Sequence, residues 1–292
     1  MPNFERVKES LFCRQPDRVP QFEGWVDQEV KDVFMGKKVS GLKSEVEFWE
    51  KAGYDFINLH INIARPIDEA YKTRTSSDVG SSYGETAQRQ WASEHDGVLS
   101  TREKMNAIKW PTLKDYKLEQ FEEVKKYLPK GMKIIGGTSG FFEHTWQMMG
   151  FETFSFALVD DPSFVEEIIG RFSELSISVM KEVVKHEEVQ ALWYCDDVAF
   201  CSGLMFSKNL LMKYLIPHIR KIKEIAQTRN LPLLYHSDGN LVTILDELVD
   251  AGLNGLHPVE PKAMDIGELK KRYGKNLCFL GGVDLNYTLT RG

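Results

Sequence analysis

The strongest candidates for catalysis or metal binding are His236, Asp238 and Glu260. They end two apolar segments, LPLLYHSDGN at 231–240 and LNGLHPVE at 253–260. Imidazole nitrogen and carboxylate oxygen are both zinc ligands, and three protein ligands with one open position form a catalytic arrangement. This set predicts a metal site. The His-x-Asp pair also suits an acid–base unit in which Asp238 orients His236, and Ser237-Asp238-Gly239 also suits a simple turn.

A second candidate is the pair of adjacent carboxylates, Asp196 and Asp197, at the end of VQALWYCDD (189–197). Neighbouring carboxylates repel, so the pair costs stability unless it is solvated or holds a cation or a hydrogen-bond donor. Side chains alternate along a strand, which sends the two carboxylates to opposite sides. We expect a catalytic role here, with one of the two facing the ligand.

Further polar residues end other apolar segments. We expect His60 to be catalytic, and Glu23, Thr138 and Asp284 to contact substrate; for Asp284, capping of the next helix is the alternative. The segment 141–154 (FFEHTWQMMGFETF) is dense in aromatic and Met residues. Its Phe141 and Trp146 suit an apolar wall against a ligand, and core packing is the alternative.

These residues are positioned by a regular alternation of strands and helices. Short apolar runs bounded by turn residues read as buried parallel strands, and ligands bind at the carboxyl ends of such strands. The predicted strands are 19–25, 54–61, 133–140, 189–197, 231–236, 253–260 and 276–284. The predicted helices are 4–12, 44–51, 118–127, 141–159, 162–186, 207–230, 241–251 and 264–273.

Seven strand–helix units favour a (β/α)8 barrel over an open sheet. We expect a single barrel domain over residues 1–292 that lacks the eighth strand and the last helix at the C-terminus. Without them, the edges of the first and seventh strands would be unpaired. The polar stretch from about 65 to 130 is too long for a plain connection and predicts a hairpin-like rim or lid.

Composition narrows the class of protein. The formal charge is −6, which does not favour nucleic-acid binding. No apolar stretch reaches the roughly 20 residues that span a bilayer, and the charged N-terminus is unlike a signal peptide. Four scattered cysteines with no C-x-x-C pair indicate free thiols in a reducing compartment. We therefore expect a cytoplasmic protein, with a homodimer left open.

The ordered motifs together resemble the uroporphyrinogen decarboxylase superfamily, and they run through almost the whole chain. The motifs are PDRVP (16–20), GGTSGFFE (136–143), GFETF (150–154), DDP (160–162), YCDD (194–197), S-K-x-L-x-x-K-Y-L-x-P (207–217), YHSDG (235–239), HPVEP (257–261) and GGVD (281–284).

The resemblance implies a (β/α)8 barrel that usually continues into an eighth strand, and one of two activities. One is cofactor-free decarboxylation of uroporphyrinogen, a tetrapyrrole. The other is zinc-assisted methyl transfer to or from a corrinoid protein. The similar zinc methyltransferases use His-x-Cys on the fifth strand and a later Cys, whereas here His236 is followed by Asp238, which implies a carboxylate ligand.

Three features weigh against the decarboxylase. Arg14-Gln15 and Arg18 match its Arg-Gln-x-x-Arg spacing but precede the first predicted strand, the second strand lacks the expected Asp, and the strand ends are acidic. We expect a methyltransferase that moves a methyl group from a small methylated or methoxylated donor to a small cobalamin-binding protein, with Zn²⁺ held by His236, Asp238 and Glu260. The alternatives are the porphyrin-pathway decarboxylase and a non-catalytic tetrapyrrole- or partner-binding remnant.

Overall fold

The computed structural model describes residues 1–71, 74–80, 86–92, 96–284, 287–288 and 291. Its residue contacts divide the chain into two compact units, one of residues 1–60, 118–138 and 180–292, the other of residues 61–117 and 139–179. The single-domain organisation with a rim at 65–130 stays a prediction.

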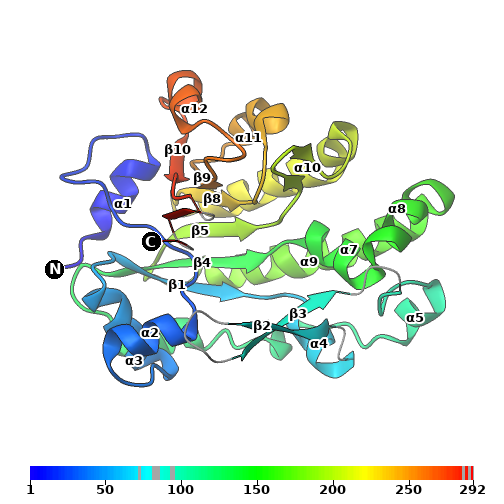
Figure 1. The fold of residues 1–292 in the computed structure, drawn as a ribbon, viewed down its shortest axis with the longest axis horizontal. Coiled ribbons are helices and arrows are strands. Elements are labelled where there is room, and N and C mark those ends of the chain that lie inside the picture. The colour runs from blue at the N-terminus through cyan, green and yellow to red at the C-terminus, as the bar shows by residue number, and fades with distance from the viewer. Residues whose placement is uncertain (72–73, 81–85, 93–95, 285–286, 289–290, 292) are drawn as a thin grey trace. The chain divides into compact units, whose positions relative to one another are not determined.

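A parallel six-stranded sheet forms the framework (Figure 1), with the strand order β1-β4-β5-β8-β9-β10. Its strands are β1 (Phe56–Ile61), β4 (Lys133–Ser139), β5 (Val189–Cys195), β8 (Leu233–His236), β9 (Gly255–Val259) and β10 (Cys278–Gly281). The order follows the sequence, and helices alternate with the strands, as in a partial (β/α)8 barrel. The predicted fold class is therefore confirmed.

Helices of the first unit alternate with these strands, and α10, α11 and α12 lie along one flank of the sheet in Figure 1. The helices of this unit are α1 (Phe4–Leu11), α2 (Gln28–Met35), α3 (Gly41–Lys51), α6 (Gln120–Glu123), α10 (Lys208–Gln227), α11 (Leu245–Asp250) and α12 (Ile266–Tyr273). Side chains at their first turns fix several starts: Asp265 accepts from the backbone N–H groups of Gly267 and Glu268 at α12.

The second unit contains the predicted hairpin, with β2 (Arg74–Gly80) antiparallel to β3 (Thr86–Ala92). Its helices are α4 (Arg65–Tyr71), α5 (Arg102–Ala107), α7 (Phe141–Met149), α8 (Phe151–Asp160) and most of α9 (Pro162–Val183). The predicted helix over 141–159 is two helices, because Gly150 between them has φ +88°, a conformation that L side chains rarely adopt.

One predicted strand is wrong. Residues 19–25 form no strand, although an apolar run is present. Pro20 cannot donate to a sheet ladder, and the segment is held by side chains instead. The rings of Phe22 and Trp25 each lie 5.1 Å from the ring of buried Trp193, and Asn58 Nδ2 donates to the Gly24 carbonyl at 3.0 Å.

One buried cluster in the core of the first unit packs on one face of the sheet. Alternate residues of β5, Ala191, Trp193 and Cys195, join one buried cluster with Phe56 of β1 and Leu234 of β8. The period of two sends the intervening residues to the helix side. This alternation decides which residues at the strand ends can lie close together.

Candidate functional site

The register of three neighbouring strands brings the candidate residues together. In the parallel pairs β5–β8 and β8–β9, Cys195 lies opposite His236, and His236 lies opposite His257. The residues that follow β5 and β8, Asp197 and Asp238, therefore leave the sheet at the same carboxyl edge. This is where ligands bind in parallel α/β folds.

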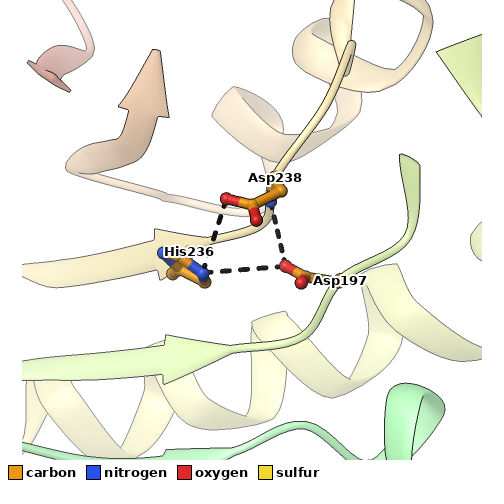
Figure 2. Close-up of side chains that lie close together, drawn as sticks. All are labelled: Asp197, His236 and Asp238. Carbon is orange, nitrogen blue, oxygen red and sulfur yellow. Dashed lines mark hydrogen bonds and ion pairs between the residues drawn. The ribbon is translucent and has the colours of Figure 1, made fainter. Parts of the chain in front are cut away.

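Asp197, His236 and Asp238 form the candidate metal centre (Figure 2). One donor atom from each lies within 4.8 Å of the others. His236 Nε2 is 3.7 Å from Asp197 Oδ1 and 3.8 Å from Asp238 Oδ1. Two ligands that each stand about 2.1 Å from zinc are about 3.4 Å apart in a tetrahedral site, so the donor spacing fits a small cation.

Local backbone contacts hold this cluster in place. Asp197 Oδ1 accepts the backbone N–H of Asp238 at 2.9 Å, and the Ser237 hydroxyl accepts that of Val198 at 3.1 Å. Gly239 has φ +86°, and a Cβ there would lie 2.4 Å from the Ala199 carbonyl oxygen. The glycine of YHSDG is therefore required by both conformation and space. The carbonyl belongs to the small hairpin β6 (Ala199–Phe200) and β7 (Gly203–Leu204).

The electrostatics of the cluster are unbalanced toward negative charge. Burial raises the pKa of Asp238, and the neighbouring Asp197 raises it further while His236 lowers it. Burial, Asp238 and Asp197, in that order, also raise the pKa of Glu260, which Lys262 lowers. Such like charges favour protonation or a bound cation.

The three-residue cluster differs from the predicted ligand set, which stays a prediction. His236 and Asp238 meet as expected, but Asp197 takes the third place, whereas Glu260 is a neighbouring charge outside the three-residue cluster. Strand order does not decide between the two carboxylates, because β5 and β9 both lie next to β8. Asp197 is held beside Asp238 by the backbone N–H of Asp238, at 2.9 Å.

The two adjacent carboxylates do separate, as alternation along β5 requires. Asp196 is fully buried and accepts the Tyr194 hydroxyl at 2.5 Å. The Tyr194 ring in turn lies 5.0 Å from His218 of α10, on the helix side of the sheet. Asp197, by contrast, stands beside His236. Asp196 has the burial and partners of a structural residue.

His60 and Thr138 lie at the carboxyl ends of β1 and β4. Burial lowers the pKa of His60 to about 4, against an opposing effect of the Thr138 backbone, and His236 contributes to the lowering. His60 is thus neutral near pH 7, and it lies close enough to His236 for an electrostatic interaction between the two rings. Thr138 itself is fully buried.

The remaining predicted contacts are placed as follows. Glu23 accepts the backbone N–H of Gly24 at 2.8 Å, and Asp284 accepts that of Tyr287 at 2.7 Å, as a capping residue does. In the second unit Phe141 is fully buried, which core packing requires, and Trp146 packs with its ring 5.6 Å from that of Phe151.

Comparison with known proteins adds the family. The model of the uroporphyrinogen decarboxylase (URO-D) family matches residues 93–292. The chain belongs to this family. No curated protein matches the sequence. Among solved structures, a methyltransferase from Methanosarcina mazei is similar over 98% of this chain and 84% of its own, with a TM-score of 0.69 and 16% identity. At that identity the likeness establishes a shared fold.

Within this URO-D chain, the arginines that match the decarboxylase spacing lie away from the metal candidate. Arg14 pairs with Glu9 of α1 at 2.6 Å. Arg18 lies 3.9 Å from Asp55, the residue before β1. Both contacts are at the amino side of the strands, opposite the carboxyl ends that carry Asp197 and His236.

Sequence reasoning missed two aromatic residues of this site. His257 Nδ1 is 2.8 Å from His236 Nδ1; its place opposite His236 could have been found by aligning the two strand ends of YHSDG and HPVEP. Trp25 is half exposed, with its ring 5.3 Å from His236 and 5.8 Å from His60. The sequence places Trp25 in a strand that does not form, so its spacing gives no sign of this position.

No helix in the described parts of the chain is long and apolar enough to cross a membrane.

Proposed function

We propose that this URO-D family protein is a methyltransferase that moves a methyl group from a small methylated or methoxylated compound to a corrinoid carried by a small partner protein. The observation that carries the proposal is the Asp197, His236 and Asp238 donor set at the carboxyl ends of neighbouring strands. The similarity in fold to a methyltransferase is consistent with it.

The donor set suits Zn²⁺. One imidazole and two carboxylates provide three ligands of the types that zinc prefers, and an open fourth position would remain for the substrate. The unbalanced negative charge of the cluster gives a cation a favourable site. Bound zinc would act as a Lewis acid on the heteroatom that carries the methyl group.

Residues of the chain would supply the rest of the chemistry. A corrinoid in the cobalt(I) state would supply the electron pair for the new bond to the methyl group, while the heteroatom would leave with the pair of the broken bond and take a proton. Glu260, whose pKa is raised beside the cluster, is the proposed carrier of that proton. We assign no catalytic role to the buried Asp196.

A cavity of about 310 Å³ in the first unit is the proposed site of the methyl donor. Trp25, Asn58 and His60 line it, together with the Lys31–Glu45 ion pair. Trp25 also contacts the metal candidate, because its ring stands edge-on to His236. The volume lies within the range of small-molecule sites, and His60 would hydrogen-bond the donor as a neutral imidazole.

Tetrapyrrole decarboxylation is the weaker proposal for this chain. A substrate with many carboxylates requires a basic cleft, and the carboxyl edge here carries Asp197, Asp238 and Glu260. The family match alone favours it.

The proposed function is tested with zinc-loaded protein and cob(I)alamin as the methyl acceptor. Methylated thiols, methylated amines and methoxylated aromatic compounds serve as donors, and methylcobalamin formation is followed by absorbance. We expect turnover with one class of donor, loss of turnover in His236→Gln, and normal turnover in His186→Gln, a histidine paired with Glu122 elsewhere. Decarboxylation of uroporphyrinogen without methyl transfer would contradict the proposal.

A further inference from the structure

The two histidines that face each other across β8 and β9 are joined by their Nδ1 atoms. His236 Nδ1 and His257 Nδ1 are 2.8 Å apart, and the rings are inclined by 29° with centroids 5.0 Å apart. A hydrogen bond at that distance needs one nitrogen to donate and the other to accept. The proton positions of the two rings are therefore linked.

The opposite nitrogen of His236 faces the two carboxylates of the candidate metal centre. Its Nε2 lies 3.7 Å from Asp197 and 3.8 Å from Asp238. An imidazole that binds a metal through Nε2 carries its proton on Nδ1. That Nδ1–H needs an acceptor, and His257 Nδ1 stands where the acceptor must be.

Water has little access to this contact. His257 is 8% exposed and the side chain of His236 is 15% exposed. The rings of Phe22 and Trp193 each lie 5.3 Å from the ring of His257. Because these surroundings are apolar, a side chain that could not accept would leave the His236 Nδ1–H buried and unpaired.

We propose that His257 is a positioning residue that accepts the Nδ1–H of His236 and so fixes the tautomer whose Nε2 faces Asp197 and Asp238 for metal binding. The inference rests on the proposed metal site. Register makes the arrangement a property of the sheet, since His236 and His257 are directly paired residues of β8 and β9.

Asparagine and leucine at position 257 form a matched pair for the test. Both side chains branch at Cγ and lose the same ring, but only asparagine has an oxygen near the place of Nδ1. His257→Leu, His257→Asn and the wild type are titrated with Zn²⁺ against a chromophoric chelator. Unfolding in urea of the metal-free proteins measures their stability in parallel.

We expect His257→Leu to lose about 10–100-fold in zinc affinity, as loss of such outer partners does elsewhere, and His257→Asn to keep most of the wild-type affinity. Equal stability of the two metal-free variants assigns the difference to the acceptor. Equal zinc affinities of His257→Leu and His257→Asn would overturn the inference while leaving the metal site in place. A wild type that binds no zinc would overturn both.

Discussion

The two ends of the parallel sheet treat charge in opposite ways. At the amino end of β1, Arg6 donates to Asp55 and to Asp17, each at 2.7 Å. The side chains of Arg6 and Asp55 are 9% and 1% exposed. At the carboxyl ends of β5 and β8, two carboxylates face one histidine, with Glu260 nearby.

The charged residues at the amino end stabilise the fold, whereas those at the carboxyl end are candidates for function. Arg6 lowers the pKa of Asp17 to about 2, chiefly by a side-chain hydrogen bond, so the carboxylate is favoured where it stands. At the opposite end burial and like charge raise the pKa values of Asp238 and Glu260. Paired charges at the amino end hold the fold, whereas unbalanced charges at the carboxyl edge are typical of functional sites and are the basis of the proposed metal site.

The largest effect is expected from Asp55→Asn. The substitution removes the buried negative charge beside the guanidinium of Arg6, which keeps Asp17 as a partner. The cost is therefore at most the roughly 3–5 kcal/mol of breaking a buried ion pair. Urea unfolding would measure the loss, and zinc affinity should stay at the wild-type value. If Asp55→Asn were stable but bound zinc more weakly, the assignment of stability to the amino end and of metal binding to the carboxyl end would be wrong.

His236→Gln should weaken zinc binding and leave stability unchanged, the reverse of Asp55→Asn. It removes a proposed ligand, so zinc affinity should fall by more than the roughly 100-fold that outer partners cost. Because the side chain is at the edge of the sheet, the free energy of unfolding of the metal-free protein should change little. His186→Gln is the matched control. The contrast fails if both variants bind zinc equally.

Glu260→Gln should give a smaller effect with a defined sign. The folded-state pKa of Glu260 is raised, so the folded protein binds its proton more tightly than the unfolded chain does, and stability falls as pH rises through that pKa. Removal of the charge should stabilise the metal-free protein at pH 7, by less than about 1 kcal/mol because the site is partly solvated. Unfolding in urea at pH 5 and pH 8 checks this; a gain at pH 5 alone would contradict it.

Asp17→Asn should give the smallest effect and the reverse sign. The folded-state pKa of Asp17 is lowered to about 2, so its contribution is present above the unfolded value near 3.8 and is lost as pH falls toward 2. The variant should be slightly less stable than the wild type at pH 6 and equal to it near pH 2. Thermal unfolding measures the stability difference between the two proteins. A difference that stays constant from pH 6 to pH 2 would contradict the link between protonation of Asp17 and stability.

Much of the framework follows from local sequence. Residues 133–140, 189–197 and 231–236 are apolar runs with polar ends, and each forms a strand of the sheet. The carboxyl-edge positions of His236 and Asp238 followed from the same pattern. These features depend on period and composition within one segment, which a sequence displays directly.

The features that sequence reasoning did not predict depend on contacts between residues far apart in the chain. Residues 19–25 look like a strand, yet Phe22 and Trp25 pack on Trp193 in place of backbone pairing. The choice of Asp197 over Glu260 depends on the direction of the side chains beyond the strand ends, because β5 and β9 both lie next to β8. The place of His257 depends on the register of β8 with β9, which no single segment encodes and which only a comparison of YHSDG with HPVEP could have indicated.

The most direct test of the metal site compares Asp197→Asn with Glu260→Gln in one zinc titration. We predict that the wild type binds one equivalent of Zn²⁺ and that Asp197→Asn loses most of this affinity. Glu260→Gln should keep it, because Asp197 belongs to the proposed donor set and Glu260 does not. Retained affinity in Asp197→Asn together with lost affinity in Glu260→Gln would contradict the site as described.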